Sequence, residues 1–354
     1  MLGNLINRHD AARLYRKLRQ GHLRQIADKV RAPGPKRVMD FWSAPGHGPG
    51  PVQWDDIPAV RRRWHTFGSM ETRFAEHAAR RWLSGRSGLQ ALSLGCGEGD
   101  RELEWARLGV FAQITGVDIS PEQIERATRN AKEAGLDHLV SFRVADAQQA
   151  LRQAEGQCDV VLALNSLHHF SRLGEIMRLI ARALGPGGLL IMDEYVGPSR
   201  FQWASGQMRA ANTLLTVLPE GHRIQRDGQV KSRVVRPSRL SMRLDDPSEA
   251  VESSSLIPAL QEHFAILEEQ PYGSILHLAL HGIAHNFLAE DDPVTAQALR
   301  LCLVAEDQAL GRLGHDFTYA VCSALAAPVP AARAIRRRGV PGPPGYDTTL
   351  DQAS

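Results

Sequence analysis

The sequence predicts an α/β protein built on a doubly wound, largely parallel sheet. Between residues 88 and 196, five short apolar runs rich in branched residues alternate with helix-length amphipathic segments. This alternation is typical of a parallel sheet with helices on both faces. A glycine-rich loop follows the first run and an acidic residue ends the second, which indicates a ligand site at the carboxyl ends of the strands.

The core elements follow in order along the chain. The expected strands cover residues 89–95, 113–119, 140–146, 158–165 and 189–196. The helices between them are expected at residues 100–109, 120–135, 146–156 and 172–188. Ser120, Pro121 and Glu122 mark the start of the second helix, because serine caps a helix and proline and an acid suit its first turn.

The rest of the chain is expected to add helical elements around this core. The expected regions are a helical N-terminal cap at 1–87, the ligand-binding core at 88–196, an inserted helical and basic cap at 197–263, the final strands with a helical insertion at 264–326, and a disordered Pro-, Gly- and Arg-rich tail at 327–354. Within them we expect helices at 64–85, 199–217, 245–264 and 276–312, and strands at 264–273 and 316–325.

Composition narrows the class of protein. The 354 residues are 43% hydrophobic and 23% charged, with a formal net charge of +3, which is ordinary for a globular domain and gives no bulk attraction to nucleic acid. The sequence has no run of about 18 apolar residues, so it predicts no membrane span. The N-terminus lacks the apolar core of a signal peptide, and the four cysteines form no CxxC pair. We therefore expect free thiols in the cytoplasm.

The strongest motif is a glycine-rich loop between an expected strand and an expected helix. Gly95, Gly97 and Gly99 alternate with other residues, so the backbone can turn tightly and approach a ligand. Asp118 ends the next strand, where a carboxylate can accept hydrogen bonds from both ribose hydroxyls. Asp146 ends the third strand. Together they predict a nucleoside-containing ligand.

A dinucleotide-dependent dehydrogenase is the main alternative for such a loop. Its Gly-x-Gly-x-x-Gly pattern requires glycine at position 100, where this chain has Asp100. Glu98 also places negative charge where a pyrophosphate would lie. A ligand that carries positive charge and no phosphate fits this loop better.

These motifs resemble the class I S-adenosylmethionine (SAM)-dependent methyltransferases. LSLGCGEG, CDVVLALNSLHHF and LGPGGLLIMDE carry the likeness, closely over residues 88–196 and loosely to about 325. The segment DEYVGP…RFQW is similar to bacterial small-molecule and glycan methyltransferases. The resemblance implies a Rossmann-like fold with a late antiparallel strand, SAM as cofactor and S-adenosyl-L-homocysteine as product. It implies these cofactor-binding residues: Gly95, Cys96, Gly97, Asp118, Ile119, Asp146, Ala147 and Asn165.

Candidate catalytic residues follow the fourth and fifth strands. Methylation of a hydroxyl requires alignment of the nucleophile and removal of a proton. His169 and Glu194 are the candidate general bases, whereas His168 is expected to shape the pocket.

Candidate substrate-binding residues lie further along the chain. They are Tyr195, Arg200, Trp203, Arg233, Arg236, His277 and His281. The arginines suit a phosphate or carboxylate, although salt bridges to the acidic run at 245–252 would equally explain them. His277, His281 and His285 recur at helical spacing; we expect hydrogen bonding or core packing from them, with a metal site as the lesser alternative.

The leading hypothesis is methyl transfer to a small-molecule or glycan acceptor, with O-methylation favoured and a phosphate-bearing acceptor possible. The alternatives are a C-methyltransferase acting on a prenyl or other metabolite, a nucleic-acid methyltransferase, and a SAM-binding protein without turnover. The absence of an Asn/Asp-Pro-Pro-Tyr/Phe motif at Asn165 argues against nucleic acid. A homo-oligomer stays an open alternative.

Overall fold

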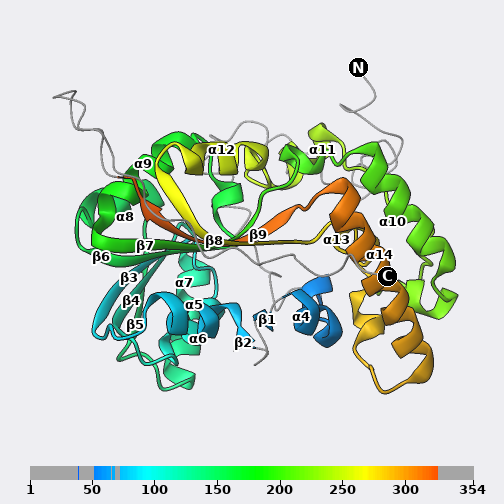
Figure 1. The fold of residues 1–354 in the computed structure, drawn as a ribbon, viewed down its shortest axis with the longest axis horizontal. Coiled ribbons are helices and arrows are strands. Elements are labelled where there is room, and N and C mark those ends of the chain that lie inside the picture. Colours follow the sequence, from blue (N-terminus) through cyan, green and yellow to red (C-terminus); the bar gives the residue numbers. More distant parts are fainter. Residues whose placement is uncertain (1–38, 40–51, 65, 68–71, 326–354) are drawn as a thin grey trace, which may run out of the picture. The chain divides into compact units, whose positions relative to one another are not determined.

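The computed structural model describes residues 39, 52–64, 66–67 and 72–325 (Figure 1). A seven-stranded sheet with the order β5-β4-β3-β6-β7-β9-β8 lies at the centre of this part. Its strands are β3 (Leu89–Leu94), β4 (Phe111–Asp118), β5 (Val140–Val144), β6 (Cys158–Leu164), β7 (Leu184–Tyr195), β8 (Phe264–Tyr272) and β9 (Phe317–Ala324). Strand β9 runs antiparallel to both its neighbours, and the pairings from β5 to β7 are parallel. The predicted mostly parallel sheet with a late antiparallel strand is confirmed.

The helices fall into those of the core and those of the additions. The core helices are α5 (Phe74–Trp82), α6 (Asp100–Ala106), α7 (Pro121–Glu133), α8 (Ala147–Gln153), η3 (Leu167–His169), α9 (Leu173–Ala183) and α12 (Leu256–Gln261). The additions are η2 (Trp54–Asp56), α4 (Pro58–Trp64), η4 (Ser199–Phe201), α10 (Ser205–Val217), η5 (Glu220–Arg223), α11 (Arg239–Asp245), η6 (Ser253–Ser255), α13 (Leu276–Ala279), η7 (Ala284–Phe287) and α14 (Pro293–Leu313). A separate two-stranded sheet pairs β1 (Thr66–Phe67) with β2 (Thr72–Arg73).

The sheet is buried on both faces, as its apolar strands predict. In β6, Val160 and Leu162 belong to one hydrophobic cluster, and Val161 and Ala163 belong to the other. This alternation follows from the two-residue period of a strand. Helices α5, α6 and α7 lie on one face, and α8, α9 and α12 lie on the other (Figure 1).

The strand order reverses between β3 and β6, so two loops diverge at their carboxyl ends. Ligands of open α/β sheets bind in the crevice at such a reversal. The next helix is fixed by a local signal: the Ser120 hydroxyl accepts a hydrogen bond from the Gln123 amide at 3.3 Å, and Pro121 opens α7. The predicted N-cap is confirmed.

Two predicted helices start later than expected. The segment 64–85 contains β1 and β2, and α5 begins only at Phe74, because Thr66, Phe67 and Thr72 suit paired strands. In the segment 199–217, Arg200 and Phe201 have φ values of 57° and 52°, outside the helical region. Helix α10 therefore begins at Ser205.

Two further expectations were wrong in the inserted regions. The predicted helix at 245–264 is reduced to α12, because the Ser248 amide donates to Asp246 Oδ1 at 2.8 Å and forms a turn. The predicted common helical face of His277, His281 and His285 does not form. Helix α13 ends at Ala279, and Gly282, with φ of 78°, separates it from η7.

Several predictions concern chain properties. All four cysteines carry free thiols, as predicted. Within the described residues, no helix is long and apolar enough to cross a bilayer. The expected tail at 327–354 and most of the expected N-terminal cap lie outside the described residues, and the regional boundaries stay predictions.

Candidate functional site

The glycine loop after β3 forms one wall of the site. Gly95, Gly97 and Gly99 have φ values of 64°, 52° and 84°, which glycine adopts without strain. A Cβ on Gly95 would lie 2.8 Å from Cβ of Ser166, which shows how closely this loop packs against the loop after β6. The glycines therefore serve both the turn and this close approach.

Asp118 joins the glycine loop to the loop after β4. Its Oδ2 accepts a hydrogen bond from the Gly97 amide at 3.0 Å, and its Oδ1 accepts one from the Ser120 amide at 2.9 Å. Burial raises the pKa of Asp118 above its usual value, although these backbone N–H groups lower it in part. The carboxylate is thus held in place before any ligand arrives.

A cavity of about 580 Å³ opens between these loops. All eight residues predicted to bind a cofactor line it: Gly95, Cys96, Gly97, Asp118, Ile119, Asp146, Ala147 and Asn165. The third strand contributes Asp146, whose Oδ1 also caps α8 by accepting from the Gln149 amide at 3.1 Å. The volume lies within the range of small-molecule sites.

Sequence reasoning did not identify the opposite wall of this cavity. It contains Arg172 and Ile176 of the α9 start together with Pro247, Ser248 and Val251 of the loop before η6. These two segments lie about 80 residues apart in the chain, and the Asp-Pro-Ser sequence at 246–248 signals only a turn.

Glu194 lies behind the cavity, in the buried layer between β7 and the loop after β6. Its Oε1 accepts hydrogen bonds from the Ser166 and Leu167 amides at 2.7 Å each, and its Oε2 lies 2.9 Å from Nδ1 of His168. The side chain is fully buried and does not line the cavity. The hydrogen bonds to Glu194 hold the loop after β6 in place. The predicted role of Glu194 as a general base stays a prediction.

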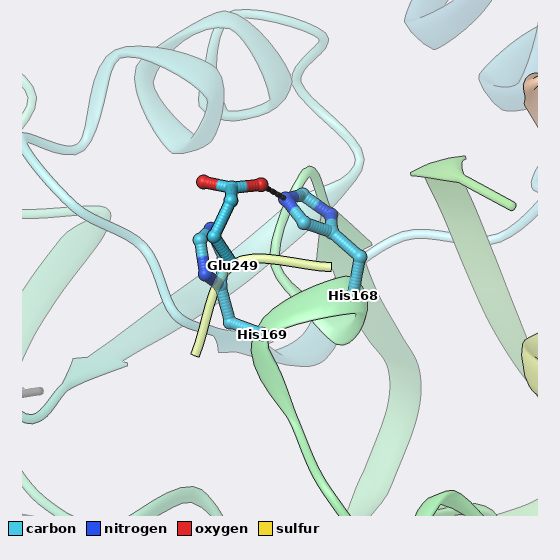
Figure 2. A group of neighbouring side chains, drawn as sticks. All are labelled: His168, His169 and Glu249. Atoms are coloured by element: carbon cyan, nitrogen blue, oxygen red, sulfur yellow. Dashed lines mark ion pairs between the residues drawn. The ribbon is translucent and has the colours of Figure 1, made fainter. Parts of the chain in front are cut away.

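His168 is held between acidic groups. Burial lowers its pKa, but the hydrogen bond and charge of Glu194, followed by the charges of Glu249 and Asp246, raise the pKa above its usual value. Its Nε2 lies 3.7 Å from Oε1 of Glu249, and Figure 2 shows this carboxylate facing the ring. Glu249 comes from the inserted region, and sequence reasoning did not select it.

His169, the other predicted base, lines the cavity. Its Nδ1 lies 3.1 Å from the Ser248 hydroxyl, which in turn donates to Asp246 Oδ1 at 2.6 Å. Because the hydroxyl has one proton and gives it to Asp246, His169 Nδ1 is the donor and its lone pair is on Nε2. Burial, followed by the charges of His168 and Arg200, lowers the pKa of His169 well below its usual value.

A comparison with known proteins indicates which kind of domain forms this cavity. Residues 86–243 match the family described as a methyltransferase domain. These residues are a methyltransferase domain of the class I, SAM-dependent family. The matched range includes the glycine loop, Asp118, Asp146 and the histidines after β6.

Two relatives and one solved structure are similar to the chain. The 27-O-demethylrifamycin SV methyltransferase of Amycolatopsis mediterranei is 36% identical over 143 residues, which cover 40% of this chain and 49% of the relative. The ubiquinone biosynthesis O-methyltransferase of Caulobacter sp. is 40% identical over 105 residues, covering 30% and 40%. The chain thus spans half or less of the length of these relatives. A geranyl diphosphate methyltransferase in complex with GPP and sinefungin aligns with a TM-score of 0.48 and 13% identity over 83% of this chain and 99% of that one.

Three of the predicted substrate-binding residues gather in an aromatic cluster away from the cavity lining of the methyltransferase domain. Trp203 packs edge-on to His277 with ring centroids 5.9 Å apart, and Tyr195 does so at 6.4 Å. The Tyr195 hydroxyl donates to the Pro198 carbonyl at 3.1 Å, and His277 Nε2 lies 3.0 Å from Asp316. Among the described residues, these contacts favour packing, and substrate binding by them stays a prediction.

The remaining predicted substrate-binding residues are spread over the inserted regions. Arg200 donates to the Glu249 carbonyl at 3.1 Å, and Arg236 donates to the Trp203 carbonyl. Arg233 and His281 are exposed. None of these four side chains lines the 580 Å³ cavity. A phosphate-binding role for the arginines stays a prediction.

Proposed function

We propose that the chain is a SAM-dependent methyltransferase that methylates an oxygen of a small-molecule or glycan acceptor. One observation carries this proposal: a single 580 Å³ cavity brings the glycine loop, Asp118, Asp146 and Asn165 together at the reversal of the strand order. The residues come from four separate loops, and a methyltransferase-domain match includes all of them. Because enzymes that share a fold can differ in function, the proposal rests on the residues of the site rather than on the fold.

The residues present fit SAM. Gly95 and Gly97 line the cavity, so the backbone at these two positions is open to a ligand without a Cβ in the way. Asp118 offers a preorganised carboxylate for ribose hydroxyls, and Asp146 lies at the end of the next strand for the adenine. Glu98 pairs with Arg126 at 2.8 Å and neither residue lines the cavity, so this ion pair offers no cation for a phosphate, and SAM carries no phosphate.

The chemistry divides between the cofactor and the chain. SAM supplies, when bound, a methyl group on a positively charged sulfur that leaves as a neutral thioether. The chain aligns the acceptor oxygen with that methyl group and helps to remove the proton of the hydroxyl. His169 is the residue placed for the second task, because it lines the cavity and its Nδ1–H bond to Ser248 leaves the lone pair on Nε2.

Two features support a small acceptor molecule that is methylated on an oxygen. The inserted loop with Pro247, Ser248 and Val251 closes one side of the cavity, as expected for a site that encloses its acceptor. The two relatives above carry names that specify O-methylation.

Binding of SAM tests the proposal directly. Isothermal titration calorimetry should detect one equivalent of SAM on the full chain. The variant Asp118→Ala should weaken binding by roughly 10- to 100-fold, because charged hydrogen bonds contribute about 1.5–3 kcal/mol. Asp137→Ala, at an exposed position, should bind like the unaltered chain. Equal affinities of the two variants would exclude the assigned cofactor site.

A further inference from the structure

His168, His169 and Glu249 form a cluster beside the cofactor cavity (Figure 2). Each offers one donor atom, and the three atoms lie within 4.8 Å of one another. The histidines belong to η3, and the glutamate belongs to the loop between α11 and η6. We propose that these three side chains hold a divalent metal ion of the zinc class, at the wall of the cavity.

The spacing of the donor atoms suits such an ion. His168 Nε2 and Glu249 Oε1 are 3.7 Å apart, too far for a hydrogen bond. Zinc binds nitrogen and oxygen ligands tetrahedrally at about 2.0–2.2 Å, which places two ligand atoms roughly 3.4 Å from each other. An ion between them would need little movement of either side chain.

Both imidazole rings are already oriented as metal ligands usually are. A metal-binding histidine donates its other ring N–H to a carboxylate or another oxygen, which fixes its tautomer. His168 uses Nδ1 with Glu194 at 2.9 Å, and His169 uses Nδ1 with Ser248 at 3.1 Å. Asp246 supports the second contact by accepting from Ser248. Each ring therefore presents Nε2 as its ligand atom.

The charges around the cluster also favour a cation. Glu194 and Glu249 lie 2.9 Å and 3.7 Å from the two ring nitrogens of His168, and Asp246 Oδ2 lies 3.8 Å from Nδ1 of His169. Arg200 is the opposing cation, and its guanidinium donates to the Glu249 carbonyl rather than to the carboxylate. The Glu249 side chain is 27% exposed, so an ion can reach the cluster from solvent. Two nitrogens and one carboxylate select zinc-class ions over magnesium, which prefers oxygen ligands.

The ion would extend the proposed function, on which this consequence rests. His169 also lines the cavity, so an ion bound there lies at the cavity wall. An oxygen of the acceptor would then be a further ligand, and coordination would make its hydroxyl acidic enough to release its proton to water, which reaches the partly exposed cluster. In this arrangement His169 acts as a ligand rather than as a base.

A titration with Co²⁺ tests the site without reference to activity. The full chain is freed of metal with a chelator and titrated while the visible absorption of the ion is recorded, and Zn²⁺ binding is measured by calorimetry. We expect one equivalent that Glu249→Gln weakens by at least about tenfold and that millimolar Mg²⁺ does not displace. His138→Ala, which removes an exposed histidine, is the matched control and should leave this equivalent unchanged.

Two results would overturn the metal site. Either the Glu249→Gln variant binds Co²⁺ as tightly as the unaltered chain, or the unaltered chain binds no stoichiometric equivalent of Co²⁺. SAM binding is measured on the same metal-free samples. Intact SAM binding without a metal site refutes this inference alone, whereas loss of SAM binding in the unaltered chain refutes the proposed function. Activity that survives chelation but not His169→Ala would return His169 to the role of base.

Discussion

The two walls of the cavity are built in different ways. The wall formed by the loops after β3 and β4 is held by backbone N–H groups, as in the bonds from Gly97 and Ser120 to Asp118. The opposite wall is held by side chains from distant segments, since His169 meets Ser248 from 79 residues away. A backbone-built wall suits a fixed ligand, whereas a side-chain-built wall can change with the acceptor. In the proposed function, the first wall faces the cofactor and the opposite wall faces the acceptor.

The largest effect should come from the side-chain wall. Replacing His169 with alanine removes the cavity-lining imidazole, whether it acts as a base or as a metal ligand. We expect methyl transfer to fall by roughly 10²- to 10⁴-fold, the usual contribution of such a group. The rate is measured with methyl-labelled SAM at saturating concentration. His138→Ala is the control, and a loss of less than threefold in His169→Ala would remove this residue from the mechanism.

The backbone wall should be most sensitive at Gly95. A Cβ there would lie 2.8 Å from Ser166 and would also be strained at a φ of 64°. We expect Gly95→Ala to weaken SAM binding by at least about tenfold, measured by calorimetry, because the two loops must separate. Gly109→Ala has a similar φ of 72° with nothing within 4 Å, so it isolates the cost of the backbone conformation. Equal SAM affinity in both variants would contradict the packing argument.

Ser248 should give a smaller effect on the side-chain wall. It links Asp246 to His169, so Ser248→Ala loosens the imidazole without removing it. We expect the turnover number to fall about tenfold while SAM affinity is unchanged. Ser254→Ala, at an exposed serine of the same inserted region, should leave both values unchanged. Weaker SAM binding in Ser248→Ala would mean that the two walls are not independent.

A last effect concerns stability, rather than binding or turnover, and lies behind the backbone wall. Burial raises the pKa of Glu102 to about 7, although a hydrogen bond from the Ser93 hydroxyl at 2.6 Å lowers it in part. A carboxyl whose pKa is raised on folding stabilises the protein below its unfolded pKa, and this stability is lost as the pH rises toward 7. Between pH 4.5 and 7.5 the unaltered chain should lose stability relative to Glu102→Gln, by an amount on the order of 3 kcal/mol.

Urea unfolding at several pH values measures this difference. Glu133→Gln, at an exposed position on α7, should follow the unaltered chain across the whole range. If Glu102→Gln and the unaltered chain show the same pH dependence, Glu102 is not the buried acid that this account requires.

Sequence reasoning located the backbone wall because its signals are local. The glycines, Asp118 and Asp146 each lie at the end of an apolar strand, and strand alternation fixes where those ends meet. Gly95, Gly97 and both aspartates, with the other residues that the family resemblance implied for the cofactor, line one cavity. Ser120 likewise marked its helix from three adjacent residues.

The side-chain wall could not be located in this way. Glu249 and Ser248 reach the site through a turn at Asp246 inside a segment whose pattern favoured a helix. At Arg200, which has a positive φ, the backbone N–H donates a hydrogen bond to the Ala250 carbonyl, 50 positions further along the chain. Helical spacing of the histidines at 277, 281 and 285 was equally misleading, because Gly282 ends the helical path. Long-range contacts of this kind leave no local pattern.

Transfer of a labelled methyl group tests the central claim most directly. The full chain is incubated with methyl-labelled SAM and a cell extract that is then fractionated by size and polarity, with Asp118→Ala as the blank. We predict label in a small-molecule or glycan fraction, stable as an O-methyl group and absent with Asp118→Ala. Label in nucleic acid or protein, or equal label with Asp118→Ala, would contradict the account of a cofactor wall facing an enclosed acceptor site.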